Sequence, residues 1–290
     1  MKNTKRRMFR FSLYDRTGIV EYLENQAKSG WLIEKIDNFG FKFRKIEPKD
    51  LHFAVTYLPK LSEFTPLPDD KQMKLFDFCE HTGWKSIEST LQLQVFYNEN
   101  DDPVPIETDA LIELENIHKA GKKSFLLTGY LLVIISVLQL LSAFLRPCDI
   151  YNVTFIILWS VLLIAHSTEL IRYYYWRKKA LKNAMTGGCF TPSKSNVWFK
   201  NILTVFLLLS LLMLFVSSAF EFGLPIVVYI ILNVSVLFLA VSGVLHLSKA
   251  MRNDGVSEKT NKIITISLII IVTVFTVSII SFIGILLQII

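Results

Sequence analysis

The sequence lacks the motifs that mark the common classes of enzyme and cofactor-binding protein. It contains no P-loop, no Gly-x-Gly-x-x-Gly, no Gly-x-Ser-x-Gly and no His-Glu-x-x-His. Its three cysteines, Cys79, Cys148 and Cys189, are far apart and have neither a CxxC nor a metal-ligand spacing. We therefore expect no enzyme activity, no cofactor and no bound metal.

Acidic residues are scarce in the second part of the chain. The net charge of +6 therefore arises from that part. Residues 124–290 contain 12 Lys and Arg but 5 Asp and Glu, whereas residues 1–123 contain 19 and 20. A nucleic-acid-binding protein needs a basic face on its soluble part. The first 123 residues are close to neutral, so we expect no nucleic-acid partner.

The whole chain of 290 residues has a mean hydropathy of +0.42. Long apolar runs are concentrated in its second part. Five runs come close to the ~20 residues that a helix needs to cross ~30 Å of hydrocarbon. Lipid offers the backbone no hydrogen-bond partner, so we expect these runs to be helices. The membrane region is predicted to cover residues 124–290, with spans at residues 124–145, 153–171, 202–220, 224–245 and 263–286.

The stretch Arg172–Lys200 predicts how these spans are oriented. It carries seven basic residues and no acid, and the connection before the last span carries four more of the twelve bases. Basic residues in short loops stay on the cytoplasmic side. Met1–Arg10 is basic but is not followed by an apolar segment, so no cleavable signal peptide is predicted. We expect a multi-pass protein of the cell membrane with a cytoplasmic N-terminus and an extracellular C-terminus.

Residues 1–106 alternate between strand-like and helix-like patterns and predict a cytoplasmic α+β domain. The predicted strands lie near residues 8–13, 32–36, 39–46, 51–57 and 91–95, with the third and fourth paired as a hairpin, and the predicted helices near residues 18–29 and 69–81. Ser29-Gly30-Trp31 and Thr82-Gly83-Trp84 end the two helices 53 residues apart. This offset predicts a duplicated helix–Gly-Trp–strand unit, for which ferredoxin-like topology is our hypothesis. Residues 107–123 are expected to form a connecting helix that ends at the membrane surface.

Two tryptophans and one polar cluster are the first candidates for a functional role. Trp31 and Trp84 would either stack on a ligand or cap the core, and burial of aromatic rings favours the core. His166, Glu169 and Arg172 follow one another at intervals of three near the inner end of the second predicted span. They would serve either as a proton relay or as ion ligands, or they would have a structural or interfacial role.

The basic residues Arg177, Lys178, Lys179 and Lys182 are candidates for binding anionic lipid. They belong to a segment, residues 177–185, that predicts an amphipathic helix ending before Gly187 and Gly188. Setting the topology would also explain these charges. The aromatic residues around them, Tyr173 to Trp176 and Trp198-Phe199, are expected at the depth of the lipid headgroups.

Several short motifs of the N-terminal part resemble a bacterial family known only as a domain of unknown function, number 2812. They are Tyr14-Asp15, Glu21-Tyr22-Leu23, Ala27 to Trp31, Glu47-Pro48, the second Gly-Trp pair and Pro105 to Asp109. The resemblance covers about residues 8–115 and implies a domain joined to a few membrane spans. Such proteins are often encoded beside a PadR-like transcriptional regulator, so the resemblance implies a part in a stress or signalling response. It supplies no catalytic residues.

Three classes of function are compatible with these observations. We favour a non-enzymatic membrane protein whose cytoplasmic domain senses a signal or docks a partner, either a cytoplasmic regulatory protein or another membrane subunit. The alternative is a transporter or transporter subunit, because single polar residues such as Gln139 and Asn233 lie in the predicted spans. An intramembrane enzyme using His166 and Glu169 is the third class.

Overall fold

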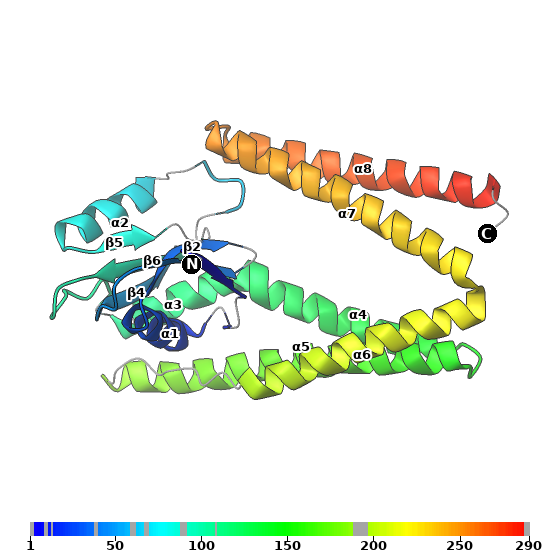
Figure 1. The fold of residues 1–290 in the computed structure, drawn as a ribbon, viewed down its shortest axis with the longest axis horizontal. Coiled ribbons are helices and arrows are strands. Elements are labelled where there is room, and N and C mark those ends of the chain that lie inside the picture. The colour runs from blue at the N-terminus through cyan, green and yellow to red at the C-terminus, as the bar shows by residue number, and fades with distance from the viewer. Residues whose placement is uncertain are drawn as a thin grey trace. The chain divides into compact units, whose positions relative to one another are not determined.

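The computed structural model describes residues 3–8, 11–12, 14–37, 40–58, 62–66, 70–87, 92–107, 109–187 and 197–286. The chain forms two compact units. The first unit contains residues 1–61, 70–137 and 162–203, and the second contains residues 62–69, 138–161 and 204–290. Figure 1 shows the strands of the N-terminal part and the long helices that come after them in the chain.

The N-terminal part contains the same β-α-β-β arrangement twice. The first copy consists of β1 (Thr4–Arg7), α1 (Arg16–Lys28), β2 (Trp31–Asp37) and β3 (Gly40–Lys45). The second consists of β4 (His52–Tyr57), α2 (Asp70–His81), β5 (Lys85–Ile87) and β6 (Leu93–Asn98). Each copy forms an antiparallel three-stranded sheet, in the orders β1-β3-β2 and β4-β6-β5. The predicted α+β class and duplication are therefore present. We call these elements, together with α3 (Ala110–Gly121), the N-terminal domain.

Three details of the predicted domain are wrong. The described strands form two three-stranded sheets, not the single four-stranded sheet of a ferredoxin-like fold. The strand at residues 51–57 was expected to pair with the strand at residues 39–46, but β4 pairs with β6, with Val55 opposite Val95. The first strand was expected at residues 8–13, but β1 is Thr4–Arg7 and residues 8, 11 and 12 are not in a strand, while residues 9, 10 and 13 lie outside the described residues. In addition, no sequence pattern indicated β5, which has three residues.

The two Gly-Trp pairs have the same local geometry. Gly30 and Gly83 have φ angles of 79° and 81°, in the left-handed region where a side chain is strained, and each ends its helix. Trp84 is buried and its Nε1 donates a hydrogen bond to the Val104 carbonyl at 2.8 Å, while Trp31 packs against the core. These contacts confirm that both rings belong to the core.

The sheet β4-β6-β5 carries apolar side chains on both faces. On one face, Val55 and Val95 join the main hydrophobic core with α1 and α3. On the other face, Ala54 and Phe96 pack with Cys79 of α2 and Trp84. This sheet therefore connects α2 to the helices on its opposite side.

The connecting helix continues into the first apolar helix. Asp109 caps α3 by accepting hydrogen bonds from the backbone of Leu111 and Ile112. The chain then passes through a π-helical turn, η1 (Lys122–Leu126), into α4 (Leu127–Ala143). The α-helix α3 ends at Gly121, within the predicted end at residues 121–123, and the helical backbone continues through η1 into α4 as far as Ala143.

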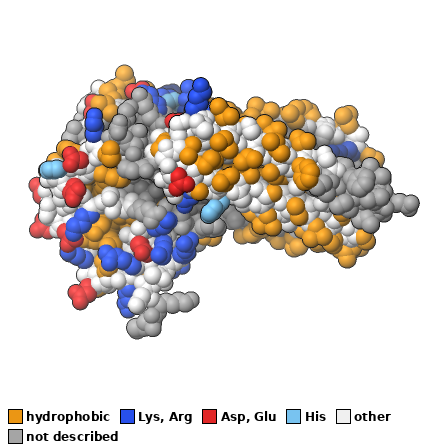
Figure 2. Space-filling model, turned by 90° about the horizontal axis from the view of Figure 1, so that it is seen from above, with side chains coloured by type: hydrophobic (Ala, Val, Ile, Leu, Met, Phe, Trp, Pro, Cys, Tyr) orange, Lys and Arg blue, Asp and Glu red, His pale blue; other side chains and the backbone are white. Residues whose placement is uncertain are grey.

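Four helices of the described residues are long and apolar enough to cross a membrane. They are α5 (Ile150–Met185), α6 (Val197–Phe222), α7 (Leu224–Asn253) and α8 (Glu258–Leu286). The first of the five predicted spans corresponds to α4, which has 17 residues and is shorter than these four. Figure 2 shows hydrophobic side chains over the long helices and charged side chains gathered over the N-terminal domain.

Polar side chains within the second unit are satisfied by neighbouring helices. Thr154 of α5 and Ser217 of α6 share a buried hydrogen bond of 2.7 Å. Asn261 of α8 is fully buried and bonds both the hydroxyl and the carbonyl of Ser248 at 2.9 Å, and it accepts from Thr265 at 3.1 Å. Interhelical hydrogen bonds of this kind hold apolar helices together where hydrophobic burial does not.

Replacing Gly30 by Ala is expected to destabilise the N-terminal domain by about 1–2 kcal/mol. The backbone has a positive φ there, and an added Cβ would lie 3.0 Å from the Ile46 carbonyl oxygen. Gly187→Ala is the matched control, because its φ is 73° but an added Cβ meets nothing within 4 Å. Thermal unfolding of the purified full-length chain measures both variants. An equal shift in the two would show that the close contact at Gly30 has no effect.

Candidate functional site

A stripe of buried residues on α5 packs against the N-terminal domain. Leu170, Tyr173, Trp176 and Ala180 are spaced three or four apart and are all buried. They belong to the same hydrophobic core as Ile19 and the other buried residues of the domain. This part of α5 lies beside the domain in Figure 1. Spacing of three and four puts residues on one face of a helix, so α5 contributes one face to the domain core.

Tyr14 is the domain residue at the centre of this contact. It is 4% exposed, and its ring centroid lies 5.2 Å from Tyr173, 5.0 Å from Trp176 and 5.8 Å from Phe125 of η1. These are favourable distances for tilted and edge-to-face aromatic pairs. His118 of α3 adds a hydrogen bond of 2.6 Å between its Nδ1 and the Tyr173 hydroxyl. We call this cluster, with the stripe on α5, the domain–α5 junction.

A polar group of three residues lies beside Tyr14. The Ser12 hydroxyl donates to Oε1 of Glu169 on α5, and Lys200 of α6 donates to the Ser12 hydroxyl at 2.7 Å. Lys200 Nζ also lies 3.4 Å from the same Glu169 oxygen. Ser12 is 7% exposed and the two charged side chains are about three-quarters covered. A paired and hydrogen-bonded charge is stable at this depth, so the group fixes the start of the domain to two long helices.

A second buried ion pair joins α1 to α3. Arg16 Nε lies 2.7 Å from Glu113 Oε1 and also donates to the Val55 carbonyl at 3.1 Å. Glu113 is 4% exposed, and burial raises its pKa to about 7, against the opposing effect of Arg16. Burial also raises the pKa of Glu107, which accepts a hydrogen bond from Thr56. Two acids therefore share one nearby cation inside the domain.

The comparison with protein families applies to this part of the chain. Residues 16–129 match a family described as "Protein of unknown function (DUF2812)". This segment is a DUF2812 domain. Comparison with the curated proteins and with the solved structures gives no significant match.

The DUF2812 domain begins with α1 and ends in the first turn of α4. The resemblance found in the sequence is confirmed, and the domain extends beyond residue 115 to include η1. The match contains Phe125 and His118 of the junction. It does not contain Ser12, Tyr14 or any residue of α5, so these parts of the junction come from outside the matched segment.

The three members of the predicted cluster lie on the continuous helix α5 and have different surroundings. Glu169 bonds Ser12 and Lys200. His166 is half-buried and makes no hydrogen bond or ion pair within the described part of the chain. Arg172 is half-buried and interacts electrostatically with Tyr14. Glu169 therefore has an identified structural partner on the domain, whereas a relay through His166 has no observed contact behind it.

The basic candidates lie on a helix that continues the span. The second predicted span was expected to end at residue 171, but α5 continues to Met185, and Gly187 follows with its positive φ. Lys178, Lys179 and Lys182 are exposed, whereas Arg177 is half-buried with its Nε enclosed. Tyr173 is 1% exposed and lies inside the protein, and its position at headgroup depth stays a prediction.

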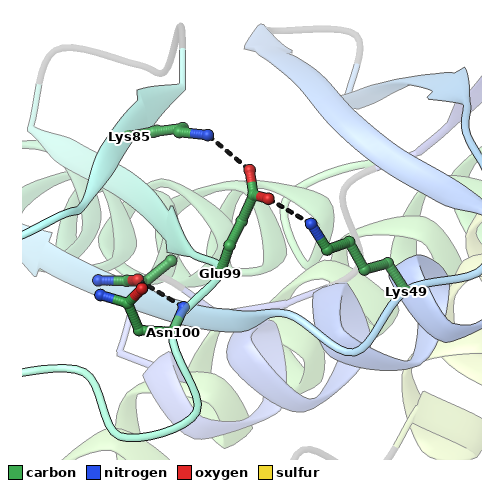
Figure 3. Close-up of polar contacts among 5 residues, drawn as sticks. Lys49, Lys85, Glu99 and Asn100 are labelled. Atoms are coloured by element: carbon green, nitrogen blue, oxygen red, sulfur yellow. Dashed lines mark hydrogen bonds and ion pairs between the residues drawn. The ribbon is translucent and has the colours of Figure 1, made fainter.

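A surface ion-pair group links the two halves of the DUF2812 domain. Glu99, which follows β6, pairs with Lys85 of β5 at 2.5 Å and with Lys49 of the connection between β3 and β4 (Figure 3). These two cations lower the pKa of Glu99 to about 2. Asn98 is buried and accepts a hydrogen bond from the Asn100 backbone at 2.9 Å, which holds the chain after β6 in place. The exposed pairs contribute little to stability, since water screens them.

Sequence reasoning missed Ser12, Tyr14 and Lys200 as members of a site. Ser12 and Lys200 are 188 positions apart, so no local pattern connects them. One signal was available, because the helical spacing of Leu170 continues with Tyr173, Trp176 and Ala180 beyond the predicted end of the span. An apolar stripe on a helix that has left the lipid needs protein to cover it.

Tyr14→Ala and Trp176→Ala are expected to be non-additive. Each alone removes a large buried ring, which typically costs about 3–5 kcal/mol, and the pair should show a coupling of about 0.5–1.5 kcal/mol. Thermal unfolding of the two single variants and the double variant gives the coupling. Trp198→Ala is the control partner for Tyr14→Ala, because Trp198 is 72% exposed. If the stability costs of Tyr14→Ala and Trp176→Ala were strictly additive, the two rings would not interact across the junction.

The stability of the DUF2812 domain is expected to fall as the pH rises from about 4.5 to about 7. The pKa of Glu113 is raised from 4.5 to about 7 in the folded chain, so the folded state binds this proton more tightly than the unfolded state. Glu113→Gln should flatten this part of the pH profile of the unfolding temperature. Glu115→Gln on the exposed side of α3, where Lys119 pairs with the acid, should leave the profile unchanged. A profile that keeps its slope in Glu113→Gln would assign the titration to another group.

Proposed function

We propose that this chain is a multi-pass membrane protein whose N-terminal domain, which contains most of the DUF2812 segment, acts in the cytoplasm without catalysis, as a sensor or partner-docking component coupled to α5. The observation that carries the proposal is the shared core of the domain and α5. Tyr14, Tyr173 and Trp176 are buried together, so the domain and the inner part of α5 form one packed unit. A change in the domain that moves Tyr14 would therefore act directly on α5.

The proposed topology has five spans, with α4 as the first. Phe125 to Ala143 is helical throughout, and 19 residues at 1.5 Å each give roughly 28 Å, close to the hydrocarbon thickness. Eleven of the twelve bases after residue 123 lie in the α5–α6 and α7–α8 connections or the helix ends beside them. This asymmetry favours the cytoplasm for both connections and the outside for the C-terminus.

One contact supports the same side for the α5–α6 connection and the domain. Lys200, at the start of α6, donates to Ser12. Glu258, at the start of α8, accepts hydrogen bonds from Ser62 at 2.7 Å and from Thr65 at 3.3 Å. Ser62 and Thr65 belong to the segment between β4 and α2. The start of α6 thus contacts the domain, whereas the contact of Glu258 lies within the second unit.

The polar contacts favour coupling over transport or catalysis. Asn233 and Ser235 of α7 each bond a carbonyl of their own helix, four residues earlier. A transport path would need such groups to face a shared cavity. The Glu169 carboxylate accepts a hydrogen bond from the Ser12 hydroxyl and pairs with Lys200. These contacts assign Glu169 a structural role. No contact among the described residues favours a transporter or an intramembrane enzyme over the docking role.

The proposal is tested by site-specific photocrosslinking of the full-length chain in cells. The crosslinker is placed at Phe78 on α2, which is 46% exposed, because the sheet β4-β6-β5 connects α2 to the junction. We expect one specific protein to be captured, with a several-fold change in yield when Tyr14→Ala opens the junction. Tyr14→Phe keeps the ring and should leave the yield unchanged.

A crosslinker at Glu115, on the exposed side of α3, controls for the position of the probe. Capture of the same proteins at Phe78 and at Glu115 would contradict a specific docking surface. A yield at Phe78 that does not respond to Tyr14→Ala would contradict coupling through the junction.

A further inference from the structure

The inner part of α5 has a second, exposed face. At 100° per residue, this face points away from the stripe formed by Tyr173, Trp176 and Ala180. It combines bases with aromatic and long apolar side chains. Its members are Tyr174, Tyr175, Lys178, Lys179, Leu181, Lys182 and Met185.

The composition of this face is typical of a helix at a membrane surface. Between Leu170 and Met185, α5 contains no Asp or Glu. Tyr175 and Met185 are 74% and 73% exposed, although they are large and amphipathic or apolar. Basic residues interleaved with tyrosines are typical of the end of a spanning helix, where aromatic rings lie near the headgroups and lysine side chains reach back toward them.

The length of α5 places this face next to the bilayer. The helix has 36 residues and is roughly 54 Å long, whereas crossing the hydrocarbon takes about 20 residues. About 16 residues therefore extend beyond the hydrocarbon on the basic side. Lys178 and Lys179 lie about two turns, roughly 11 Å, past the last apolar residues of the span, at Leu170 and Ile171, so their long side chains can reach back toward the charged headgroups.

Arg177 does not belong to this face. It is half-buried and its Nε is enclosed. Burial lowers the pKa of the His118 imidazole, and the nearby charge of Arg177 lowers it further. Arg177 therefore lies toward the domain–α5 junction. The exposed cations are Lys178, Lys179 and Lys182.

We propose that the exposed face of α5 binds anionic phospholipid headgroups of the inner leaflet and that this binding stabilises the domain–α5 junction. The occupant is inferred from charge complementarity, because three cations and no acid face outward where the helix leaves the hydrocarbon. The same helix segment carries Tyr173 and Trp176 on its other side, so fixing its position on the lipid favours the packed junction. This inference rests on the proposed function and names anionic lipid as a signal for it.

The test uses the full-length chain in nanodiscs of phosphatidylcholine, with and without phosphatidylglycerol. Native mass spectrometry counts the phosphatidylglycerol molecules that the protein retains. We expect the wild type to retain several and the Lys178→Gln, Lys179→Gln, Lys182→Gln variant to bind them on the order of tenfold to a hundredfold more weakly. The control replaces Lys28, Lys49 and Lys85 by Gln, because it removes the same charge from the exposed surface of the N-terminal domain.

Hydrogen exchange of α1 and of residues 170–180 measures the junction in the same nanodiscs. Phosphatidylglycerol should slow the exchange in the wild type and in the control, but not in the α5 triple variant. Equal retention by the two triple variants, or equal retention of phosphatidylcholine and phosphatidylglycerol, would overturn the lipid site. Retention without any change in exchange would overturn its coupling to the junction.

The junction itself is measured separately, in nanodiscs of phosphatidylcholine alone. Tyr14→Ala should accelerate exchange there whether or not anionic lipid binds. If it does so while phosphatidylglycerol has no effect, the lipid inference fails and the proposed coupling of domain and helix stands. If Tyr14→Ala changes nothing, the proposed function fails first.

Discussion

The burial of Tyr14 against Tyr173 and Trp176 is the interaction on which the arrangement of the first unit depends. A helix that leaves the membrane with an apolar stripe cannot expose it to water without cost, and the β-α-β-β domain has an aromatic ring available to cover it. Ser12 and Glu169 add a polar contact at the edge of the same surface, which fixes the register of the packing. The domain and the helix therefore complete one another's core.

Buried charge adds specificity to this core at a cost in stability. Arg16 and Glu113 form an ion pair inside the domain, and Glu107 brings a second acid close to the same cation. Hydrophobic residues of similar size would often be more stable at such a position. The pair instead fixes α3 against α1, and through η1 it fixes the direction in which the chain enters α4. Its titration near neutral pH is a consequence of that burial.

Local patterns predicted the elements of the fold, but not how they are paired. The Gly-Trp repeats and the helical periodicity of α1 are set by neighbouring residues, and the structure has both where the sequence indicates them. The pairing of β4 with β6 depends on residues about 40 positions apart, and alternation alone fits β3 equally well. Local patterns could not predict the junction either, because Ser12, Glu169 and Lys200 are far apart in sequence and meet only in the folded chain.

Helical geometry changes the meaning of the basic stretch that begins at Arg172. In sequence its tyrosines, tryptophan and lysines are mixed, and a count of charges accounts for them as a topological signal. In a helix, residues 173, 176 and 180 turn to one side and residues 175, 178 and 182 to the other. The first set is buried in protein and the second is exposed. One continuous helix can therefore hold the domain with one face while its positive charges keep the other face at the membrane surface.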